Sequence, residues 1–420
     1  MTVGIICEYN PPHRGHAYQL AQLRRQYPDC RVICVMSGNF VQRGTPAVCD
    51  KYLRARAALA LGADAVVELP FPYSCAPAEL FARAGVHILA ALGIDALCFG
   101  TEGEVLPQLE TIAAHLDSAE FTSAMEAALS GRDDSARTVG YPVLRERVFA
   151  SLYGDREAAL LRTPNNTLAV EYLRALSALP RKVTPIAIPR TGDGHDAPDR
   201  STPHEHRIVS ASAVRARMAD GDFDGAMALL PTPTAGMLWD AHTRGQLCTD
   251  PDTVPGALLL HHYRTVSPEV LSQYAGLSDG LAGRLCRAAE QAHTAAEMLA
   301  LASSKSHTHA AIRRAALYGF FGVTTEQLQT PPSYTLLLAA NTEASPLLRR
   351  AKKAAPNAIV AACGCYAQTH QREVESLALD VVGGTGGRMA FIDDLERAYD
   401  KRQRIVRLDD ALRRREFELL

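Results

Sequence analysis

Two histidines near the start of the chain carry the clearest chemical signal in the sequence. His13 and His16 belong to residues 10–16 (Asn-Pro-Pro-His-Arg-Gly-His), between an apolar run at 3–8 and a helical pattern at 15–27. A helix N-terminus offers free backbone N–H groups and a partial positive charge, which together bind phosphate. The glycine between the histidines allows close backbone approach, and two imidazole donors would stabilise charge developing on phosphate. We therefore predict a polyphosphate site with His13 and His16 as catalytic residues.

The elements that must position this motif alternate between strands and helices through the first half of the chain. Apolar runs of strand type lie at 3–8, 31–36, 65–69, 96–99 and 182–189, with helical patterns between them. Buried strands that alternate with helices of about 10–15 residues are typical of βαβ units in a parallel sheet. Ligands bind at the carboxyl ends of such strands. The predicted fold class is therefore α/β, a Rossmann-like parallel-sheet domain with the histidine motif at its ligand-binding edge.

The second half of the chain has a different composition. Beyond residue 221 it is rich in Ala, Leu, Arg and His, with short strand-like runs only at 334–338 and 358–362. We place the main boundary near residues 220–230. This division predicts a nucleotide-binding catalytic domain over 1–225 and a mostly α-helical domain over 226–420.

Composition and charge narrow the classes of protein. The chain has 420 residues, of which 47% are hydrophobic and 21% charged, with a formal net charge of -2. These values exclude a disordered chain and a polycation, so any nucleic-acid binding must come from local basic faces. No apolar run approaches the ~20 residues of a membrane helix, and the N-terminus lacks the basic region of a signal peptide. The ten scattered cysteines then indicate reduced thiols, and we expect a cytoplasmic protein without membrane contact.

The His-x-Gly-His motif resembles that of the nucleotidyltransferase superfamily, whose members transfer an adenylyl or cytidylyl group. A second stretch, residues 210–215 (Ser-Ala-Ser-Ala-Val-Arg), resembles the Ser-rich helix start with which this superfamily holds the β- and γ-phosphates. The resemblance implies that Ser210 and Arg215 bind nucleotide. A plain helix cap followed by an exposed arginine is the alternative.

Longer stretches narrow the resemblance to one family. The sequence is similar to the bacterial tRNA(Met) cytidine acetate ligases at residues 8–11, 37–44, 68–71, 98–102, 140–142, 164–168 and 188–190, in the same order along the chain. The resemblance implies that ATP and acetate form acetyl-adenylate with release of pyrophosphate. The wobble cytidine of elongator tRNA(Met) then takes the acetyl group on its exocyclic amine. Magnesium is expected with the polyphosphate, although the sequence contains no dedicated metal ligands.

The resemblance also implies a set of nucleotide-binding residues. Gly100, Asn165 and Arg190 would complete the ATP site, where the alternatives are a turn glycine, a helix-start amide (with Asn166 as a substitute) and a solvated charge. The family's ATP-contacting segment corresponds here to Ile6, Cys7, Glu8, Tyr9, Asn10, Pro11, Pro12, His13, Arg14, Gly15, His16, Ala17, Tyr18 and Gln19.

Further polar residues follow the second predicted strand and should face the same crevice. Gly38, Asn39, Gln42 and Arg43 would bind acetate, the target cytidine or tRNA phosphate, and the sequence does not decide among these. Lys51 and Arg54, at the start of the next helix, extend a positive rim or else belong to a solvated helix face.

A basic stretch in the second half suggests contact with the tRNA backbone. Seven basic residues face two acids between residues 305 and 353, an excess that suits an RNA surface. Lys305, Arg313 and Arg314 are the candidate contacts, and a solvated helix face is the alternative. Two other functions stay open from sequence: a small-molecule nucleotidyltransferase and a non-catalytic tRNA-binding protein.

Overall fold

The computed structural model describes residues 1–130, 140–190, 208–250, 254–278, 280–304, 307–341, 350, 352–363, 379–383 and 388–407. The chain forms two compact units: residues 1–89 with 94–341, and residues 90–93 with 342–420. The structure thus divides the chain at Asn341, whereas the sequence placed a boundary near residue 225. The reason is that helices beyond 225 pack onto the sheet-bearing part of the larger unit, for example through Leu238 against Leu53.

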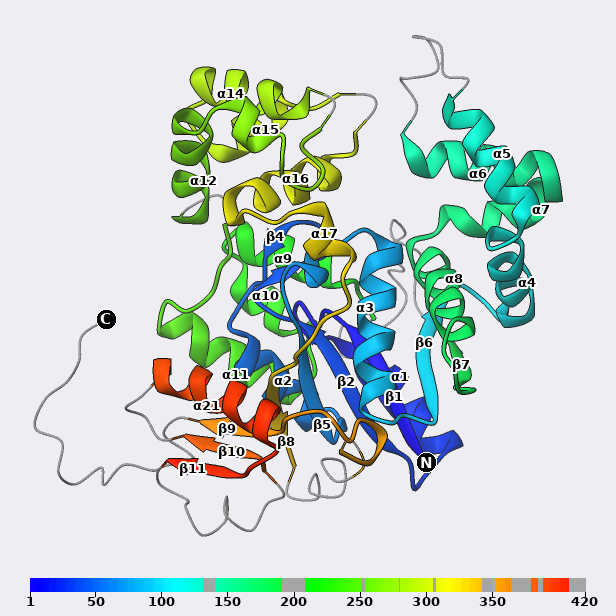
Figure 1. The fold of residues 1–420 in the computed structure, drawn as a ribbon, viewed down its shortest axis with the longest axis vertical. Helices are drawn as coiled ribbons and strands as arrows, with labels where there is room; N and C mark the ends of the chain where they lie inside the picture. Colours follow the sequence, from blue (N-terminus) through cyan, green and yellow to red (C-terminus); the bar gives the residue numbers. More distant parts are fainter. Residues whose placement is uncertain are drawn as a thin grey trace, which may run out of the picture. The chain divides into compact units, whose positions relative to one another are not determined.

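A six-stranded sheet forms the centre of the larger unit (Figure 1). Its strand order is β7-β6-β1-β2-β5-β8, and all neighbours are parallel except β5 and β8. The strands are β1 (Thr2–Cys7), β2 (Arg31–Ser37), β5 (Ala65–Leu69), β6 (Ala96–Thr101), β7 (Thr184–Pro189) and β8 (Leu337–Ala340). The predicted α/β class and its five parallel strands are confirmed. Strand β8 was predicted only as a short isolated run.

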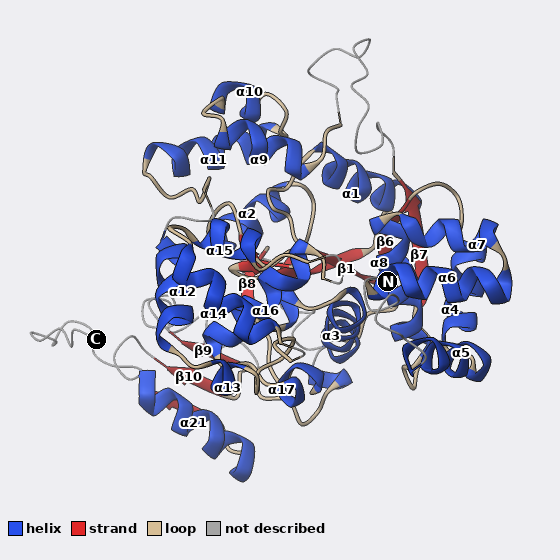
Figure 2. Ribbon diagram, turned by 90° about the horizontal axis from the view of Figure 1, so that it is seen from above, coloured by secondary structure: helices blue, strands red, loops and turns tan. Residues whose placement is uncertain are grey.

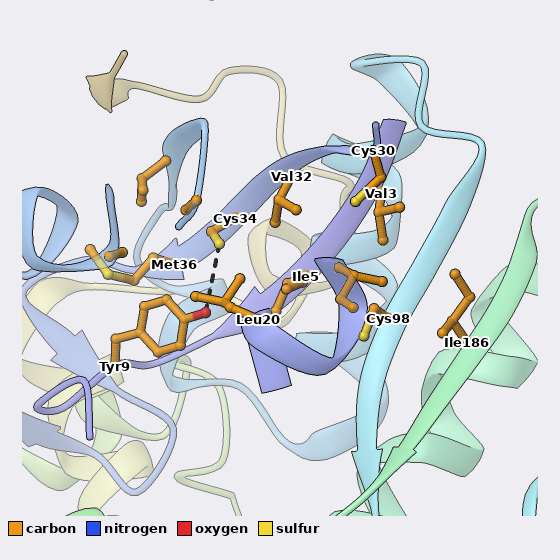
Figure 3. Packing of buried hydrophobic residues seen from close by; sticks show 14 of the residues in the cluster. Val3, Ile5, Tyr9, Leu20, Cys30, Val32, Cys34, Met36, Cys98 and Ile186 are labelled. Atoms are coloured by element: carbon orange, nitrogen blue, oxygen red, sulfur yellow. Dashed lines mark hydrogen bonds between the residues drawn. The ribbon is translucent and has the colours of Figure 1, made fainter. Parts of the chain in front are cut away.

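Alternate residues of β1 face the two layers of helices. Val3 and Ile5 pack with Leu20 of α1 (Arg14–Gln26) in the main core (Figure 3). In the same core, Tyr9 Oη lies 3.7 Å from Cys34 Sγ. Gly4, between them, points to α3 (Ala78–Ala91), where an added Cβ would lie 2.7 Å from Leu89. This two-residue period with apolar side chains on both faces explains the uninterrupted hydrophobic strands.

The connections make a topological switch point between β1 and β6. From β1 the chain passes through α1 to β2 and through α2 (Lys51–Ala60) to β5, and α3 then returns it to the opposite side of β1. At such a reversal the loops after the two strands diverge and leave a crevice outside their carboxyl ends. The histidine motif follows β1 directly, so it opens onto this crevice.

Helices complete the larger unit. Those that follow β6 are α4 (Leu106–Leu116), α5 (Ala119–Ser130), α6 (Tyr141–Tyr153), α7 (Asp155–Ala159) and α8 (Pro164–Ser177). Those that follow β7 are α9 (Ala211–Ala219), α10 (Phe223–Met227), α11 (Thr232–Thr243), α12 (Val254–Thr265), α13 (Pro268–Leu271), α14 (Leu281–Gln291), α15 (Ala295–Leu301), α16 (His309–Phe321) and α17 (Thr325–Gln329). Helices α12 to α16 lie together (Figure 2) and share an apolar core that includes Tyr263, Leu285 and Ile312.

The smaller unit contains a second sheet, although the sequence predicted a mostly helical region. Its strands β9 (Ala361–Cys363), β10 (Val381–Gly383) and β11 (Ile405–Arg407) are parallel in the order β11-β10-β9. Helix α21 (Arg388–Lys401) connects the last two strands. Within the described ranges of both units, no helix has the length and apolar character needed to cross a membrane.

Candidate nucleotide-binding site

His13 and His16 cap helix α1 by a reciprocal pair of hydrogen bonds. The Nδ1 atom of His13 accepts the N–H of Gly15 at 3.0 Å, and Nδ1 of His16 accepts the N–H of His13 at 3.1 Å. The centroids of the two imidazole rings lie 3.7 Å apart. Because each Nδ1 is an acceptor, a neutral ring must carry its proton on Nε2. The motif therefore presents two Nε2–H donors next to each other.

Burial keeps both imidazoles neutral. It lowers the pKa of His13 to about 3, with smaller contributions from the positive charges of Arg190 and Arg215. The pKa of His16 is also well below its ordinary value, first because of burial and then because of His13 and Arg190. Near pH 7 the pair therefore acts as hydrogen-bond donor and not as a pair of cations.

The histidine pair lines two adjoining cavities at the carboxyl ends of β1 and β6. One has a volume of about 180 Å³ and the other of about 270 Å³. Since the cavities share much of their lining, they form one cleft. The shared residues are Ile6, Cys7, Glu8, His13, His16, Asn165, Leu168, Tyr172 and Arg190.

Most residues predicted for the nucleotide site line this cleft. Gly15, Tyr18, Gln19 and Gly100 belong to the first cavity, whereas Ser210 and Arg215 belong to the second. The predicted residues that line neither cavity are Tyr9, Asn10, Pro11, Pro12, Arg14 and Ala17.

Three of the residues outside the cleft have structural partners. The buried ring of Tyr9 lies 4.7 Å from that of His16. Asn10 Oδ1 accepts the N–H of Val48 at 2.7 Å, and Arg14 Nη2 donates to the carbonyl oxygen of Ala228 at 2.9 Å. These contacts fix the turn that carries the histidines.

The N-terminus of α9 forms one end of the cleft. Ser210 caps this helix, since its Oγ accepts the N–H of Ala213 at 3.3 Å. One turn later, Arg215 Nη1 donates to the carbonyl oxygen of Asn10 at 2.6 Å, which ties α9 to the histidine turn. The burial of Arg215 lowers its pKa, an effect that the nearby Glu8 opposes and Arg43 reinforces. The helix N-terminus and the guanidinium together offer hydrogen-bond donors and positive charge, a combination that suits a phosphate group.

Two residues of the cleft, Asn165 and Arg190, contact a carboxylate outside its lining that was not singled out as a site residue. Glu102, just beyond β6, accepts a hydrogen bond from Asn165 Nδ2 and lies 3.8 Å from Arg190 Nη1. Asn166, in contrast, is buried and its Oδ1 accepts the N–H of Glu102 at 2.9 Å, so Asn165 is the amide that lines the cleft. Glu102 could have been identified from the sequence, because it directly follows the strand that contains Gly100.

Gly100 has an open face. An added Cβ would meet its nearest neighbour, Cγ of Arg190, at 3.5 Å, which is an ordinary contact. Packing within the protein therefore does not require glycine here. The missing side chain instead widens the cleft.

The residues predicted to bind acetate, cytidine or tRNA are separated by the structure. Gln42 and Arg43 line the larger cavity, whereas Asn39 is exposed away from it. Gly38 is buried, and a Cβ there would lie 2.1 Å from Glu68 Oε1. Lys51 Nζ pairs with the other oxygen of Glu68 at 2.7 Å.

The prediction that Arg54 belongs to a positive rim or a solvated face was wrong. Its side chain is fully buried, and its guanidinium donates to four carbonyl oxygens. Two distances are 2.8 Å to Glu8 and 3.0 Å to Ser37, and the other acceptors are Cys49 and Gly38. Arg54 therefore ties together the segments that follow β1 and β2.

The basic residues of the second half differ in their exposure and in their contacts. Arg314 Nη1 donates to the carbonyl oxygen of Gln42 at 3.3 Å, so α16 packs on the hairpin β3–β4 (Phe40–Val41 and Thr45–Pro46) beside the cleft. Arg313 is exposed on the same helix. Lys305 lies outside the described residues. Lys352, one of the seven basic residues counted between 305 and 353, belongs to the smaller unit, where it pairs with Asp380 at 2.6 Å.

The fold and this cleft define a nucleotidyltransferase-type protein. Residues 1–386 match the model of the family described as HIGH Nucleotidyl Transferase. The chain is 36% identical to the tRNA(Met) cytidine acetate ligase of Syntrophotalea carbinolica, over 84% of this chain and 82% of that one. It is 33% identical to the protein of the same name from Lysinibacillus sphaericus, over 84% and 87%. The chain belongs to the HIGH nucleotidyl transferases and, within them, to the tRNA(Met) cytidine acetate ligase family.

Solved structures agree with this assignment. The fold is similar to that of Thermotoga maritima TmcAL bound with alpha-thio ATP, with a TM-score of 0.76, 26% identity and coverage of 94% of this chain and 91% of that chain. The apo form of the same protein gives the same TM-score over 97% and 100% of the two chains.

Proposed function

We propose that the protein is an ATP-dependent ligase that converts acetate to acetyl-adenylate and acetylates the wobble cytidine of elongator tRNA(Met), giving N4-acetylcytidine. The observation that carries this proposal is the reciprocal cap of His13 and His16, which directs two neutral donors to a cleft at the switch point of the sheet. The relatives named for this activity, and the similar fold of a protein bound to an ATP analogue, support the choice of substrates.

ATP would lie along the cleft, with its terminal phosphates at the N-terminus of α9 and its nucleoside near Asn165 and Gly100. The α9 N-terminus and Arg215 suit the terminal phosphates, since both supply donors and positive charge. Asn165 and the open face of Gly100 suit the nucleoside. The histidines would then meet the α-phosphate region.

This placement fits both chemical steps. In the first, an acetate oxygen attacks the α-phosphorus, the bond from that phosphorus to the bridging oxygen breaks, and pyrophosphate leaves with the electron pair. The Nε2–H donors stabilise charge on the phosphate oxygens as it develops. In the second, the cytidine amine attacks the acetyl carbon and AMP leaves. Holding the reactants in one cleft supplies the orientation that both steps need.

Magnesium is proposed to enter with the nucleotide. Among the residues that the structure describes, no group of three or more His, Cys, Asp or Glu side chains could hold a metal ion. Magnesium commonly keeps several waters and binds through substrate phosphates. The ion would neutralise polyphosphate charge that Arg190 and Arg215 only partly balance.

The tRNA would approach across the hairpin β3–β4. Arg43 of this hairpin is exposed and lines the cleft, and the exposed Arg313 lies on the helix that packs against the hairpin. Two exposed guanidinium groups beside the cleft suit phosphates that flank a cytidine inserted into it.

The test is exchange of labelled pyrophosphate into ATP, with and without acetate. The ligase predicts exchange that depends on acetate. A small-molecule nucleotidyltransferase would exchange only with another acceptor, and a non-catalytic tRNA-binding protein would not exchange at all. Mass analysis of tRNA(Met) after incubation with ATP and acetate checks the second step, because each acetylated cytidine gains one acetyl group.

A further inference from the structure

Glu8 is the only carboxylate among the described residues that line either cavity of the cleft. It follows the last residue of β1, at the same sheet edge as the histidine motif. Both cavities include it, so its side chain lies at their junction. The attack on acetyl-adenylate would take place at this junction under the proposed function.

The position of the Glu8 side chain is fixed by the protein. Its Oε1 accepts the N–H of Gln42 at 2.8 Å, and its carbonyl oxygen accepts a hydrogen bond from the buried Arg54 at 2.8 Å. The described part of the chain makes no hydrogen bond to Oε2. One carboxylate oxygen is thus anchored, and the other is available to a ligand.

The other polar groups of the cleft are poor proton acceptors. The Nδ1 atoms of His13 and His16 already accept backbone N–H groups, and their Nε2 atoms carry the protons. Burial raises the pKa of the Cys7 thiol and that of the Tyr172 phenol, so both groups stay protonated. The remaining charged side chains there are arginines, which are donors only.

We propose that Glu8 is the general base of the acetyl-transfer step. This inference rests on the proposed function. The N4 amine of cytidine attacks the acetyl carbon, a C–N bond forms, and one N4 proton passes to Glu8 Oε2. The bond between the acetyl carbon and the phosphate oxygen breaks, and AMP leaves with that electron pair. A base is needed because the amine has little basicity of its own and becomes strongly acidic once it has attacked.

Acetate activation needs no such base. Acetate is already an anion at neutral pH, so its attack on the α-phosphorus releases no proton. Glu8 therefore acts as a base in the second step and not in the first. This difference separates the role of Glu8 from a role in ATP binding.

The variant Glu8→Gln tests the proposal, because the amide oxygen still accepts the N–H of Gln42 while the basic oxygen is lost. Acetate-dependent pyrophosphate exchange should fall much less than acetyl transfer, because attack by an acetate anion needs no base. Transfer of acetyl from preformed acetyl-adenylate to tRNA, measured in a single turnover, should fall by roughly 10²–10⁴-fold, the usual contribution of a general base.

Two further variants distinguish a general base from a residue that acts in ATP binding. Glu8→Asp keeps a carboxylate and should transfer acetyl at least about tenfold faster than Glu8→Gln. Glu102→Gln changes a carboxylate that contacts Asn165 and Arg190, so pyrophosphate exchange should require a higher concentration of ATP.

Several outcomes would overturn the assignment of Glu8. Transfer by Glu8→Gln at the wild-type rate would do so, and so would an equal loss of exchange and transfer, which would indicate a role in nucleotide binding. A wild-type protein without acetate-dependent exchange would instead refute the proposed function itself.

Discussion

The N–H of His13 donates to the ring of His16, while the ring of His13 caps the helix on which His16 lies. The N–H of Gly15 thereby fixes the tautomer of the His13 ring, and the N–H of His13 fixes that of the His16 ring, so each ring keeps Nε2–H as a donor. The two rings cannot move independently, because they are 3.7 Å apart and linked by the same turn. In the proposed mechanism, a pair built in this way is oriented before the nucleotide arrives, which lowers the cost of transition-state stabilisation.

Replacing His16 by alanine should abolish most of the first chemical step. His16→Ala removes one Nε2–H donor, and the loss of one such donor typically reduces the rate by about 10²–10³-fold. Acetate-dependent pyrophosphate exchange measures this loss. The variant also loses the acceptor for the N–H of His13, so the free energy of unfolding should fall by about 1 kcal/mol, while the protein stays folded and still binds tRNA.

A surface histidine provides the control for this variant. His293 is exposed and uses only its backbone N–H, which donates to Glu297. His293→Ala should therefore exchange pyrophosphate at the wild-type rate. Normal exchange by His16→Ala would remove the histidine pair from the mechanism.

The low pKa of His13 makes stability depend on pH in a defined window. Burial lowers this pKa to about 3, while the unfolded chain titrates near 6.5. Between these values the unfolded state binds more protons, so the stability contributed by neutral His13 is complete above pH 6.5 and is lost as the pH falls toward 3. The expected slope is about 1.4 kcal/mol per pH unit.

Denaturant unfolding at pH 6.5 and pH 5.0 checks this prediction. Asparagine is a good helix cap without a titrating ring, so His13→Asn isolates the effect of protonation. The wild type should lose about 2 kcal/mol more than the variant between the two pH values. Equal losses would show that His13 does not titrate on unfolding in this window.

Arg54 should be essential for stability. Its guanidinium is fully buried and is the partner of carbonyl oxygens in the segments that follow β1 and β2. Arg54→Met would leave these acceptors unpaired, and the free energy of unfolding should drop by about 3–5 kcal/mol. Arg56→Met changes an exposed arginine on the same helix and should cost less than about 0.5 kcal/mol. Similar unfolding free energies for the two variants would contradict this account.

The burial of Arg54 is a feature that the sequence alone could not predict. The strands were predictable because β1, β2 and β5 are uninterrupted apolar runs, and the His-x-Gly-His turn lies where any parallel sheet would place it. In contrast, an arginine in an Ala-rich helix has the same local pattern whether it is solvated or buried. Its carbonyl partners come from segments that meet only in the folded chain.

Contacts between residues far apart in the sequence account for the other differences between the sequence-based predictions and the structure. Strand β8 joins β5 from about 270 residues away, through pairs such as Val66 with Ala339, and no local pattern reveals that partner. Lys51 has the pattern of an exposed helix start, yet Glu68 at the end of β5 neutralises it. Several cleft residues that the sequence identified, such as Ile6, Gly100 and Arg190, lie in or next to strand ends, where position along the chain predicts position in space.

Arg313 should contribute to tRNA binding through charge alone. It is exposed on α16, and the loss of one phosphate contact should lower the salt dependence of tRNA binding by about one unit of slope. Filter binding of tRNA(Met) by Arg313→Ala over a range of salt concentrations measures this slope. Arg25→Ala, on the exposed end of α1, is the matched control and should keep the wild-type slope. If both variants gave the wild-type slope, α16 would not be part of the RNA surface.

A crystal structure with an ATP analogue whose α–β bridge resists cleavage tests the central claim most directly. The account predicts an α-phosphate oxygen within hydrogen-bond distance of Nε2 of His13 or His16, about 2.7–3.2 Å. The γ-phosphate should lie at the N-terminus of α9 near Arg215. A nucleotide bound elsewhere, with the histidine turn free of phosphate, would contradict the account.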